Sequence, residues 1–362
     1  MRVLSPILNQ VIYPVLGKAG YFRSRASASV VTYHGVLPEG YAVQDSFLDN
    51  TLISIDAFRS QLRLLKSKYN VISPHQFREW LRGRESLPER AVLLTCDDGL
   101  LNNLTVMTAL LQKEDLQCLF FLTGSSVADK PAMLWYIELY LMMREARKSA
   151  PVDWRGIRVP KLPADQETRR AQWLQLTDGL SELDAVRRAE FLGEAVQWWG
   201  LDREWQKAYL HHPLLRQRFQ LLDGAQQRQL VEAGMTVGAH TLSHPVLSRQ
   251  SDQFARREIA ESKQDLENAT GRSVWAMAYP YGNPAAVGDR EFRFAKEAGY
   301  SCAFMNVPGA LASAGKFSLP RVHVTADMTW GQFEANVSGF HHALQQRIRP
   351  AQVSADSQPS VR

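Results

Sequence analysis

Short apolar runs that alternate with longer amphipathic segments are the feature of this sequence that most constrains its fold. The runs have the length and composition of β-strands, and the segments between them carry apolar residues at helical spacing. Strands separated by helices are typical of an α/β protein with parallel strands. We predict strands at residues 30–36, 91–97, 117–123, 235–239, 274–279, 301–304 and 319–324. We predict helices at residues 56–68, 74–81, 101–114, 252–268, 290–298 and 330–346.

Seven strands with intervening helices indicate a distorted (β/α)7-type barrel, whose active site is expected where the strands end at their C-termini. One stretch interrupts this rhythm, because residues 133–232 carry helical patterns and no predicted strand. This stretch is too long for a crossover and is interpreted as a helical insertion. We therefore divide the chain into an N-terminal helical segment (1–28), a barrel (29–132 and 233–347), an insert (133–232) and a flexible tail (348–362).

The insert has two interpretations, which depend on its tryptophans. Exposed Trp and Arg are typical of binding faces, so the insert either covers the site or contacts a partner. Alternatively, the tryptophans fill a core of its own. We expect it to govern substrate choice, and its deletion to leave metal binding intact. The tryptophans are Trp135, Trp154, Trp173, Trp198, Trp199 and Trp205.

Composition narrows the class of partner. The formal net charge is +5 and the pI about 9.1, a mild excess that favours an acidic polymer or an anionic membrane surface. No run of Lys and Arg is interleaved with aromatic residues, so we expect no nucleic-acid binding. Three cysteines make an odd count and indicate buried, reduced thiols.

The N-terminal stretch of residues 1–23 does not read as a secretory signal, because Asn9 and Gln10 interrupt its apolar run. It is also too short and too broken to span a bilayer. Two interpretations stay open: a peripheral amphipathic anchor, or a first helix that packs on the domain. We expect a cytoplasmic protein, free or at the inner face of the membrane, and export stays open.

Two adjacent carboxylates, Asp97 and Asp98, follow the predicted strand at residues 91–97. Two like charges at the rim of a core cost stability through repulsion and desolvation. The arrangement becomes favourable if one carboxylate binds a divalent cation, which then dominates the local charge. The pair therefore predicts a metal site.

His240 and His244 follow another predicted strand and supply the missing ligands. Side chains four residues apart share one face of a helical turn, so both imidazoles can point at one ion. Asp-Asp-Gly alone is most often a turn. Together, two His and one Asp make a three-ligand site with an open position, which is typical of a hydrolytic metal centre.

Three motifs resemble those of the polysaccharide deacetylase family (NodB homology, carbohydrate esterase family four). They are Thr95-Cys96-Asp97-Asp98-Gly99, His240-Thr241-Leu242-Ser243-His244 and Tyr279-Pro280-Tyr281-Gly282. Residues 32–36 and 319–322 also look like segments of members linked to bacterial exopolysaccharide synthesis. The resemblance covers residues 28–128 and 233–325. It implies a distorted (β/α) barrel and metal-dependent removal of acetyl groups from N-acetylhexosamine units.

Carried over by position, the resemblance implies that Asp98, His240 and His244 hold the metal. The metal is commonly zinc in this family, with Co²⁺, Ni²⁺ and Mn²⁺ as alternatives. Asp97 is then the general base that takes a proton from metal-bound water. The backbone N–H of Tyr281 is implied as a donor to the oxyanion.

The resemblance weakens at two positions. Ala278 stands where the family usually has an Arg that orients the base. Arg321 is a candidate for that role, and the alternative for Arg321 is a surface ion pair. The family's late His, the general acid, has no obvious counterpart, and His323 and His34 are competing candidates.

The resulting prediction is a hydrolase that removes N-acetyl groups from a bacterial surface polysaccharide or its lipid-linked precursor. An O-acetyl esterase or another amide hydrolase is the alternative on the same fold. A glycan-binding pseudoenzyme is the alternative from another class. An N-acetylated glycan is the expected partner, and contact with a membrane or biosynthetic complex through the N-terminus or the insert stays open.

Overall fold

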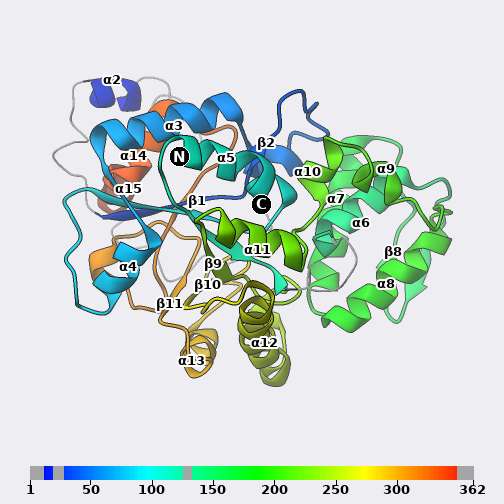
Figure 1. The fold of residues 1–362 in the computed structure, drawn as a ribbon. Coiled ribbons are helices and arrows are strands. Elements are labelled where there is room, and N and C mark those ends of the chain that lie inside the picture. Colours follow the sequence, from blue (N-terminus) through cyan, green and yellow to red (C-terminus); the bar gives the residue numbers. More distant parts are fainter. Residues whose placement is uncertain (1–11, 19–27, 125–132, 349–362) are drawn as a thin grey trace.

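A curled parallel sheet forms the centre of the protein. The computed structural model describes residues 12–18, 28–124 and 133–348 (Figure 1). Within these ranges eight strands form one sheet in the order β11-β10-β9-β6-β5-β1-β12, with β4 paired to the start of β5. The strands are β1 (Ser29–Tyr33), β4 (Asn70–Ile72), β5 (Ala91–Cys96), β6 (Leu119–Leu122), β9 (Thr236–Ala239), β10 (Ala276–Ala278), β11 (Cys302–Phe304) and β12 (Val322–His323).

The sheet curls into a half-barrel. The segment of residues 319–323 contacts both β11 at one end of the sheet and β1 near the other. Leu319 pairs with Phe304 of β11, and four residues later His323 of β12 pairs with Thr32 of β1. Helices surround this sheet. The fold class predicted from the sequence, a distorted (β/α) barrel, is confirmed.

Strand β5 determines where the site lies. It is buried along its whole length between β1 and β6. Its side chains alternate between two cores: Val92 and Leu94 face the core beneath the outer helices, and Leu93 faces the barrel interior with Phe121 and Phe304. The same alternation directs Thr95 and then Asp97 to the interior. The strand therefore delivers a carboxylate to the C-terminal mouth of the barrel.

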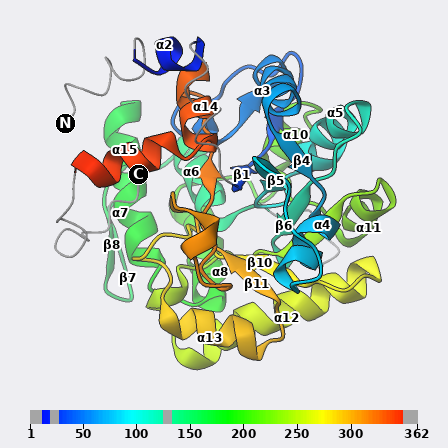
Figure 2. The ribbon, with the colours of Figure 1, turned by 90° about the vertical axis from the view of Figure 1, so that its left-hand side faces the viewer.

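The helices confirm most of the sequence prediction. Figure 2 shows α12 and α13 along one side of the sheet, and α14 with α2 on the opposite side. The helices around the barrel are α2 (Tyr13–Lys18), α3 (Ile55–Lys68), α4 (Pro74–Leu81), α5 (Thr108–Lys113), α11 (Gly224–Glu232), α12 (Asp252–Thr270), α13 (Asp289–Glu297), α14 (Trp330–Val337) and α15 (Phe340–Ile348). The predicted helix 330–346 is in fact two helices, because Gly339 adopts a φ of 75° between them.

In the N-terminal half one predicted strand is wrong in detail, and two short strands were missed. The predicted strand 30–36 breaks after Tyr33, and residues 36–37 form β2, which pairs with β3 (Ile53–Ser54). The break lies at Gly35, whose φ is 147° and where a Cβ would come within 2.2 Å of Asn102. The strands β3 and β4 were not predicted, because two or three residues are too few to show a pattern.

The insert forms a lobe of its own beside the barrel, on the right of Figure 1. It contains a two-stranded antiparallel hairpin that the prediction of a purely helical insert missed. The hairpin turns at Arg155 and Gly156, both with positive φ, and Arg155 replaces the Asn or Asp that usually marks such a turn. The elements of the insert are α6 (Trp135–Glu145), β7 (Val152–Trp154), β8 (Ile157–Val159), α7 (Gln166–Leu180), α8 (Ala185–Trp198), α9 (Lys207–Leu210) and α10 (Leu215–Phe219).

The tryptophans of the insert are not an exposed binding face. Five of the six are buried in a hydrophobic core that the insert forms together with Leu48, Leu52 and Leu100, and Trp198 is half-buried against it. This supports the interpretation that they fill a core. The last helix assigned to the insert, α11, packs differently: its Leu230 belongs to the barrel core. The separate hydrophobic core therefore ends near Leu221.

The described part of the N-terminal segment packs on the barrel. Tyr13 of α2 is fully buried against Ala335 of α14, and Phe340 of α15 packs on the same cluster. Residues 1–11, 19–27 and the predicted tail beyond 348 lie outside the described residues. Among the described helices, none combines the length and apolar character needed to cross a membrane. The three cysteines are free and buried, as expected.

Close packing at β9 leads to the first prediction. A Cβ on Gly238 would lie 2.6 Å from the Phe121 ring and 2.9 Å from the carbonyl oxygen of Ala276. We expect Gly238→Ala to lower the free energy of unfolding by about 1–3 kcal/mol. The matched control is Gly193→Ala in α8, where no atom lies within 4 Å and a gain of about 0.5–1 kcal/mol is expected. Urea denaturation measures both, and equal effects would contradict the packing described for β9.

Candidate metal centre

The backbone turns sharply at Asp98, the second of the two adjacent carboxylates at the end of β5. The amide of Asp97 donates to the carbonyl of Tyr33 at 2.9 Å, which continues the pairing with β1. Asp98 then adopts a φ of 75°, so the chain turns and the two side chains diverge. The carbonyl of Asp98 accepts hydrogen bonds from the amide and hydroxyl of Thr123, at 3.4 and 3.2 Å. Both carboxylates are buried, and each has its own surroundings.

His240 and His244 lie in the irregular segment that follows β9, not on the helical turn that their spacing suggested. Thr241 and His244 have φ values of 64° and 54°, and these two left-handed residues fold the segment back on itself. Four of the seven non-glycine residues with positive φ in the described chain are Asp98, Thr241, His244 and Tyr281. Such backbone strain clusters at functional sites.

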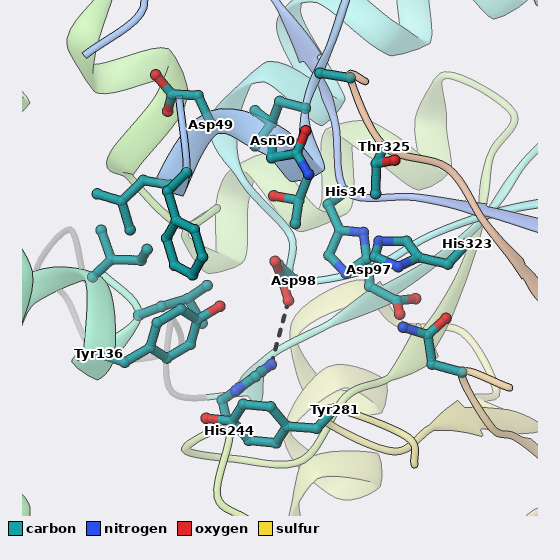
Figure 3. A pocket seen from close by; sticks show the side chains of 18 of the residues that line it. His34, Asp49, Asn50, Asp97, Asp98, Tyr136, His244, Tyr281, His323 and Thr325 are labelled. Carbon is teal, nitrogen blue, oxygen red and sulfur yellow. Dashed lines mark ion pairs between the residues drawn. The ribbon is translucent and has the colours of Figure 1, made fainter. Parts of the chain in front are cut away.

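The structure brings Asp98, His240 and His244 together. The Oδ1 atom of Asp98 lies 3.6 Å from Nε2 of His240. The same atom lies 3.4 Å from Nε2 of His244, a contact drawn as a dashed line in Figure 3. The potential ligand atoms all lie within 4.8 Å of one another, and the three residues are buried. Among the described residues this is the one group of three or more His, Cys, Asp or Glu side chains with such spacing.

The donor atoms of this group fit a divalent cation. Nδ1 of His240 donates to the carbonyl of Ala278 at 2.8 Å, which leaves the lone pair on Nε2 facing Asp98. The Oδ1 atom of Asp98 is buried without a hydrogen-bond partner. Burial raises the pKa of Asp98, but the two imidazoles outweigh it and hold that pKa well below its usual value. A carboxylate and two imidazole nitrogens that face one point suit zinc and similar ions.

Arg321 holds Asp97 in a buried, bidentate ion pair. Its Nη1 and Nη2 atoms donate to the two carboxylate oxygens at 2.7 and 2.6 Å, and its Nε donates to the carbonyl of Met305 at 3.1 Å. The guanidinium also lies over the rings of Phe121 and Phe304 at the top of the barrel interior. The alternative of a surface ion pair is therefore wrong, because Arg321 is only 2% exposed.

The charge of Asp97 follows from this pair. Burial raises the pKa of the carboxyl, whereas Arg321 and then His240 lower it, and the net effect keeps the pKa below its ordinary value. Asp97 is thus ionised at neutral pH. Each carboxylate oxygen keeps a further lone pair, so the bidentate pair leaves Asp97 able to accept a proton.

His34 and His323 lie side by side next to Asp97 (Figure 3). Their ring centroids are 4.8 Å apart, because β12 pairs with β1 in the register that places His323 opposite Thr32. Nδ1 of His34 and Nε2 of His323 are buried without hydrogen-bond partners. Burial, and then the charge of His34, lower the pKa of His323 to about 3. Both candidates for the general acid therefore reach the site.

The site opens into a cavity of about 1540 Å³ that the insert walls on one side. Tyr281 lines this cavity with its ring 5.0 Å from that of His244. Tyr136 of α6 faces the same histidine at 5.5 Å. Sequence reasoning missed Tyr136, since no motif marks a residue that reaches the site only through packing of the insert. Other residues of the insert and of the segment after β2 complete the wall: Phe47, Leu48, Asn50, Leu134, Ile137, Arg170, Trp173 and Leu174.

The buried ion pair leads to the second prediction. Arg321→Met leaves the Asp97 carboxylate buried without its cation, and we expect the free energy of unfolding of the metal-free protein to fall by about 3–5 kcal/mol. Adding Asp97→Asn to this variant should restore part of the loss, because the uncompensated charge is gone. Arg272→Met changes an exposed side chain and is the control, with an expected effect within about 0.5 kcal/mol. A double variant no more stable than Arg321→Met would contradict the coupling.

The site can now be compared with known proteins. Residues 205–303 match the family model described as polysaccharide deacetylase. The Bacillus subtilis polysaccharide deacetylase homologue YxkH is 26% identical over 116 residues, which are 32% of this chain and 40% of that protein. The matched part thus spans less than half of that relative.

Three solved structures share the fold. The deacetylase PplD of Streptococcus pyogenes, in complex with acetate, is 17% identical with a TM-score of 0.53 over 86% of this chain and 99% of that one. A de-N-acetylase from Aggregatibacter actinomycetemcomitans is 16% identical with a TM-score of 0.54 over 85% and 98%. IcaB from Ammonifex degensii is 20% identical with a TM-score of 0.52 over 86% and 97%. The resemblance that the motifs indicate is confirmed: residues 205–303 match the polysaccharide deacetylase family model, and the chain shares the fold of these three structures.

Proposed function

We propose that this protein is a metal-dependent hydrolase that removes N-acetyl groups from N-acetylhexosamine units of a bacterial surface polysaccharide or its lipid-linked precursor. One observation carries the proposal. The metal-ligand cluster of Asp98, His240 and His244 shares a cavity with a buried carboxylate, Asp97, that Arg321 keeps ionised. The family match to polysaccharide deacetylases supports a hydrolase that acts on acetyl groups.

Asp98, His240 and His244 would hold the metal. When bound, a divalent cation such as Zn²⁺ polarises the acetyl carbonyl and lowers the pKa of water. Asp97 takes the proton of the attacking water, since it is ionised and is not needed as a ligand. Arg321 fixes both oxygens of that carboxylate, in the role that the family usually gives to an Arg at the position of Ala278.

The oxyanion and the leaving amine need further partners. Tyr281 lines the cavity beside His244, and we assign its backbone N–H to the oxyanion. For the general acid the two histidines differ. His323, with its pKa near 3, is neutral at physiological pH, and a neutral imidazole is a poor acid for protonating an amine. His34 follows Tyr33, which pairs with Cys96 beside Asp97, so we assign the acid to His34.

The substrate is proposed from the cavity and the family. The insert and the segment after β2 form a largely apolar wall opposite the carboxylates, which supports a role of the insert in substrate choice. The likeness of the fold to a de-N-acetylase supports an N-acetylated substrate. A location in the cytoplasm, free or at the inner face of the membrane, belongs to the same proposal. An O-acetylated glycan presents the same carbonyl, and acetate release from matched N- and O-acetylated substrates separates the two activities.

The third prediction tests the metal site. We expect about one Zn²⁺ per chain in the parent protein and little in His240→Ala, which loses one of three ligands. His75→Ala is the control, because His75 is exposed on α4. Elemental analysis after zinc loading and desalting measures the metal content. A parent protein that retains no zinc would contradict the proposed function and favour a glycan-binding role.

The fourth prediction separates the base from the ligands. Asp97→Asn should keep its zinc and lose acetate release by about 10²–10⁴-fold, the usual contribution of a general base. Asp56→Asn, on a side chain 96% exposed, should change neither property. Acetate released from an N-acetylglucosamine oligomer gives the rate. Full activity of Asp97→Asn would rule out the assigned role.

A further inference from the structure

Two of the three metal ligands are held by the barrel itself. The backbone amide of His240 donates to the carbonyl of Leu122 at 2.9 Å, and its ring donates to the carbonyl of Ala278 at 2.8 Å. Asp98 is fixed through its carbonyl by Thr123. Each of these partners belongs to, or directly follows, a strand of the sheet. The sheet alone therefore sets the positions of Asp98 and His240.

His244 lacks such support. Its backbone is strained at a φ of 54°, and its Nδ1 atom is buried with no hydrogen-bond partner, so no acceptor fixes its ring from behind. A metal-ligating histidine almost always has such an acceptor. Its amide donates only to Thr241 within the same turn, at 3.2 Å. The position of His244 must therefore be fixed by contacts to its backbone and to the face of its imidazole ring.

The insert provides these contacts. The indole Nε1 of Trp135 donates to the backbone carbonyl of His244 at 3.1 Å. The ring of the next residue, Tyr136, lies 5.5 Å from the His244 imidazole. Both residues lie at the start of α6, the first helix of the insert.

A second contact reaches the preceding residue. Arg188 of α8 donates from Nη2 to the hydroxyl of Ser243 at 3.0 Å, and its guanidinium lies over the Trp135 ring at 4.9 Å. The same hydroxyl donates to Glu258 of α12 at 2.6 Å, and Glu258 also accepts the amides of Leu242 and Ser243. Arg188 and Glu258 are each 2% exposed. The segment that carries His244 is thus clamped between the insert and a barrel helix.

We propose that Trp135 and Arg188 are positioning residues for the metal ligand His244, so that the insert completes the metal centre. This inference rests on the proposed function, since it concerns the same metal. It replaces the expectation that the insert can be deleted with metal binding intact. Loss of partners that orient a metal ligand typically lowers metal affinity by 10–100-fold.

The test compares two identical substitutions in the insert core. Trp135→Phe removes the N–H that holds His244 and keeps the aromatic ring. Trp199→Phe is the matched control, because Trp199 is fully buried and its Nε1 has no hydrogen-bond partner. Zinc affinity is measured by competition with a chromophoric chelator, and the absorption spectrum of the Co²⁺ form reports the ligand geometry. We expect about 10–100-fold weaker zinc binding and an altered spectrum for Trp135→Phe alone.

A second pair guards against simple misfolding. Arg188→Met removes the contact to the Ser243 hydroxyl and leaves that hydroxyl on Glu258, and it is compared with Arg187→Met, an exposed neighbour on α8. Urea denaturation of the metal-free proteins shows whether stability has changed. Weaker zinc binding of Trp135→Phe and Arg188→Met, but not of Arg187→Met, at unchanged metal-free stability supports the inference. Parent-like zinc affinity of both overturns it, and a parent that binds no zinc overturns the proposed function together with it.

Discussion

The burial of two adjacent carboxylates at the end of β5 is the constraint on which the rest of the site depends. Both carboxylates are almost fully buried, and each is compensated separately. Asp97 faces the barrel interior and meets the guanidinium of Arg321, whereas Asp98 turns away through its left-handed backbone and meets two imidazoles. The division gives adjacent residues different chemistry: one retains its charge beside a guanidinium, and the other is suited to coordinate a cation.

The two carboxylates meet different partners because the C-terminal ends of several strands lie together at one end of the half-barrel. β5 supplies both carboxylates, β9 leads to the histidines, and the segment around β12 supplies Arg321 and His323. The insert then adds what the half-barrel lacks, a wall for the cavity and contacts to the segment of His244. Barrel and insert have separate hydrophobic cores, yet they meet at the metal ligands. The segment of His244 is thereby where the insert and the candidate metal centre are in contact.

The sequence predicted the parts that follow from local pattern. Strand and helix alternation located the sheet, and the motifs located Asp97, Asp98, His240 and His244 near one point. It did not predict how His240 and His244 converge, since helical spacing was assumed where two left-handed residues fold the segment. The sequence also did not show whether Arg321 is buried or exposed. Its burial depends on the curl of the sheet, which brings its guanidinium over the rings of Phe121 and Phe304. Contacts such as Trp135 with His244 leave no mark in sequence spacing.

The pairing of Arg321 with Asp97 also has a consequence for the order in which the molecule is made. The two residues are 224 positions apart, and the arginine directly precedes β12, the last strand of the sheet along the chain. During synthesis the nascent chain carries its base and all three ligands before the partner of the base exists. Until that segment docks, the carboxylate of Asp97 lacks the guanidinium of Arg321. Its burial in the barrel interior would then carry the full cost of desolvating an unpaired charge. The ion pair of the site can therefore form only after the segment that carries Arg321 has been made.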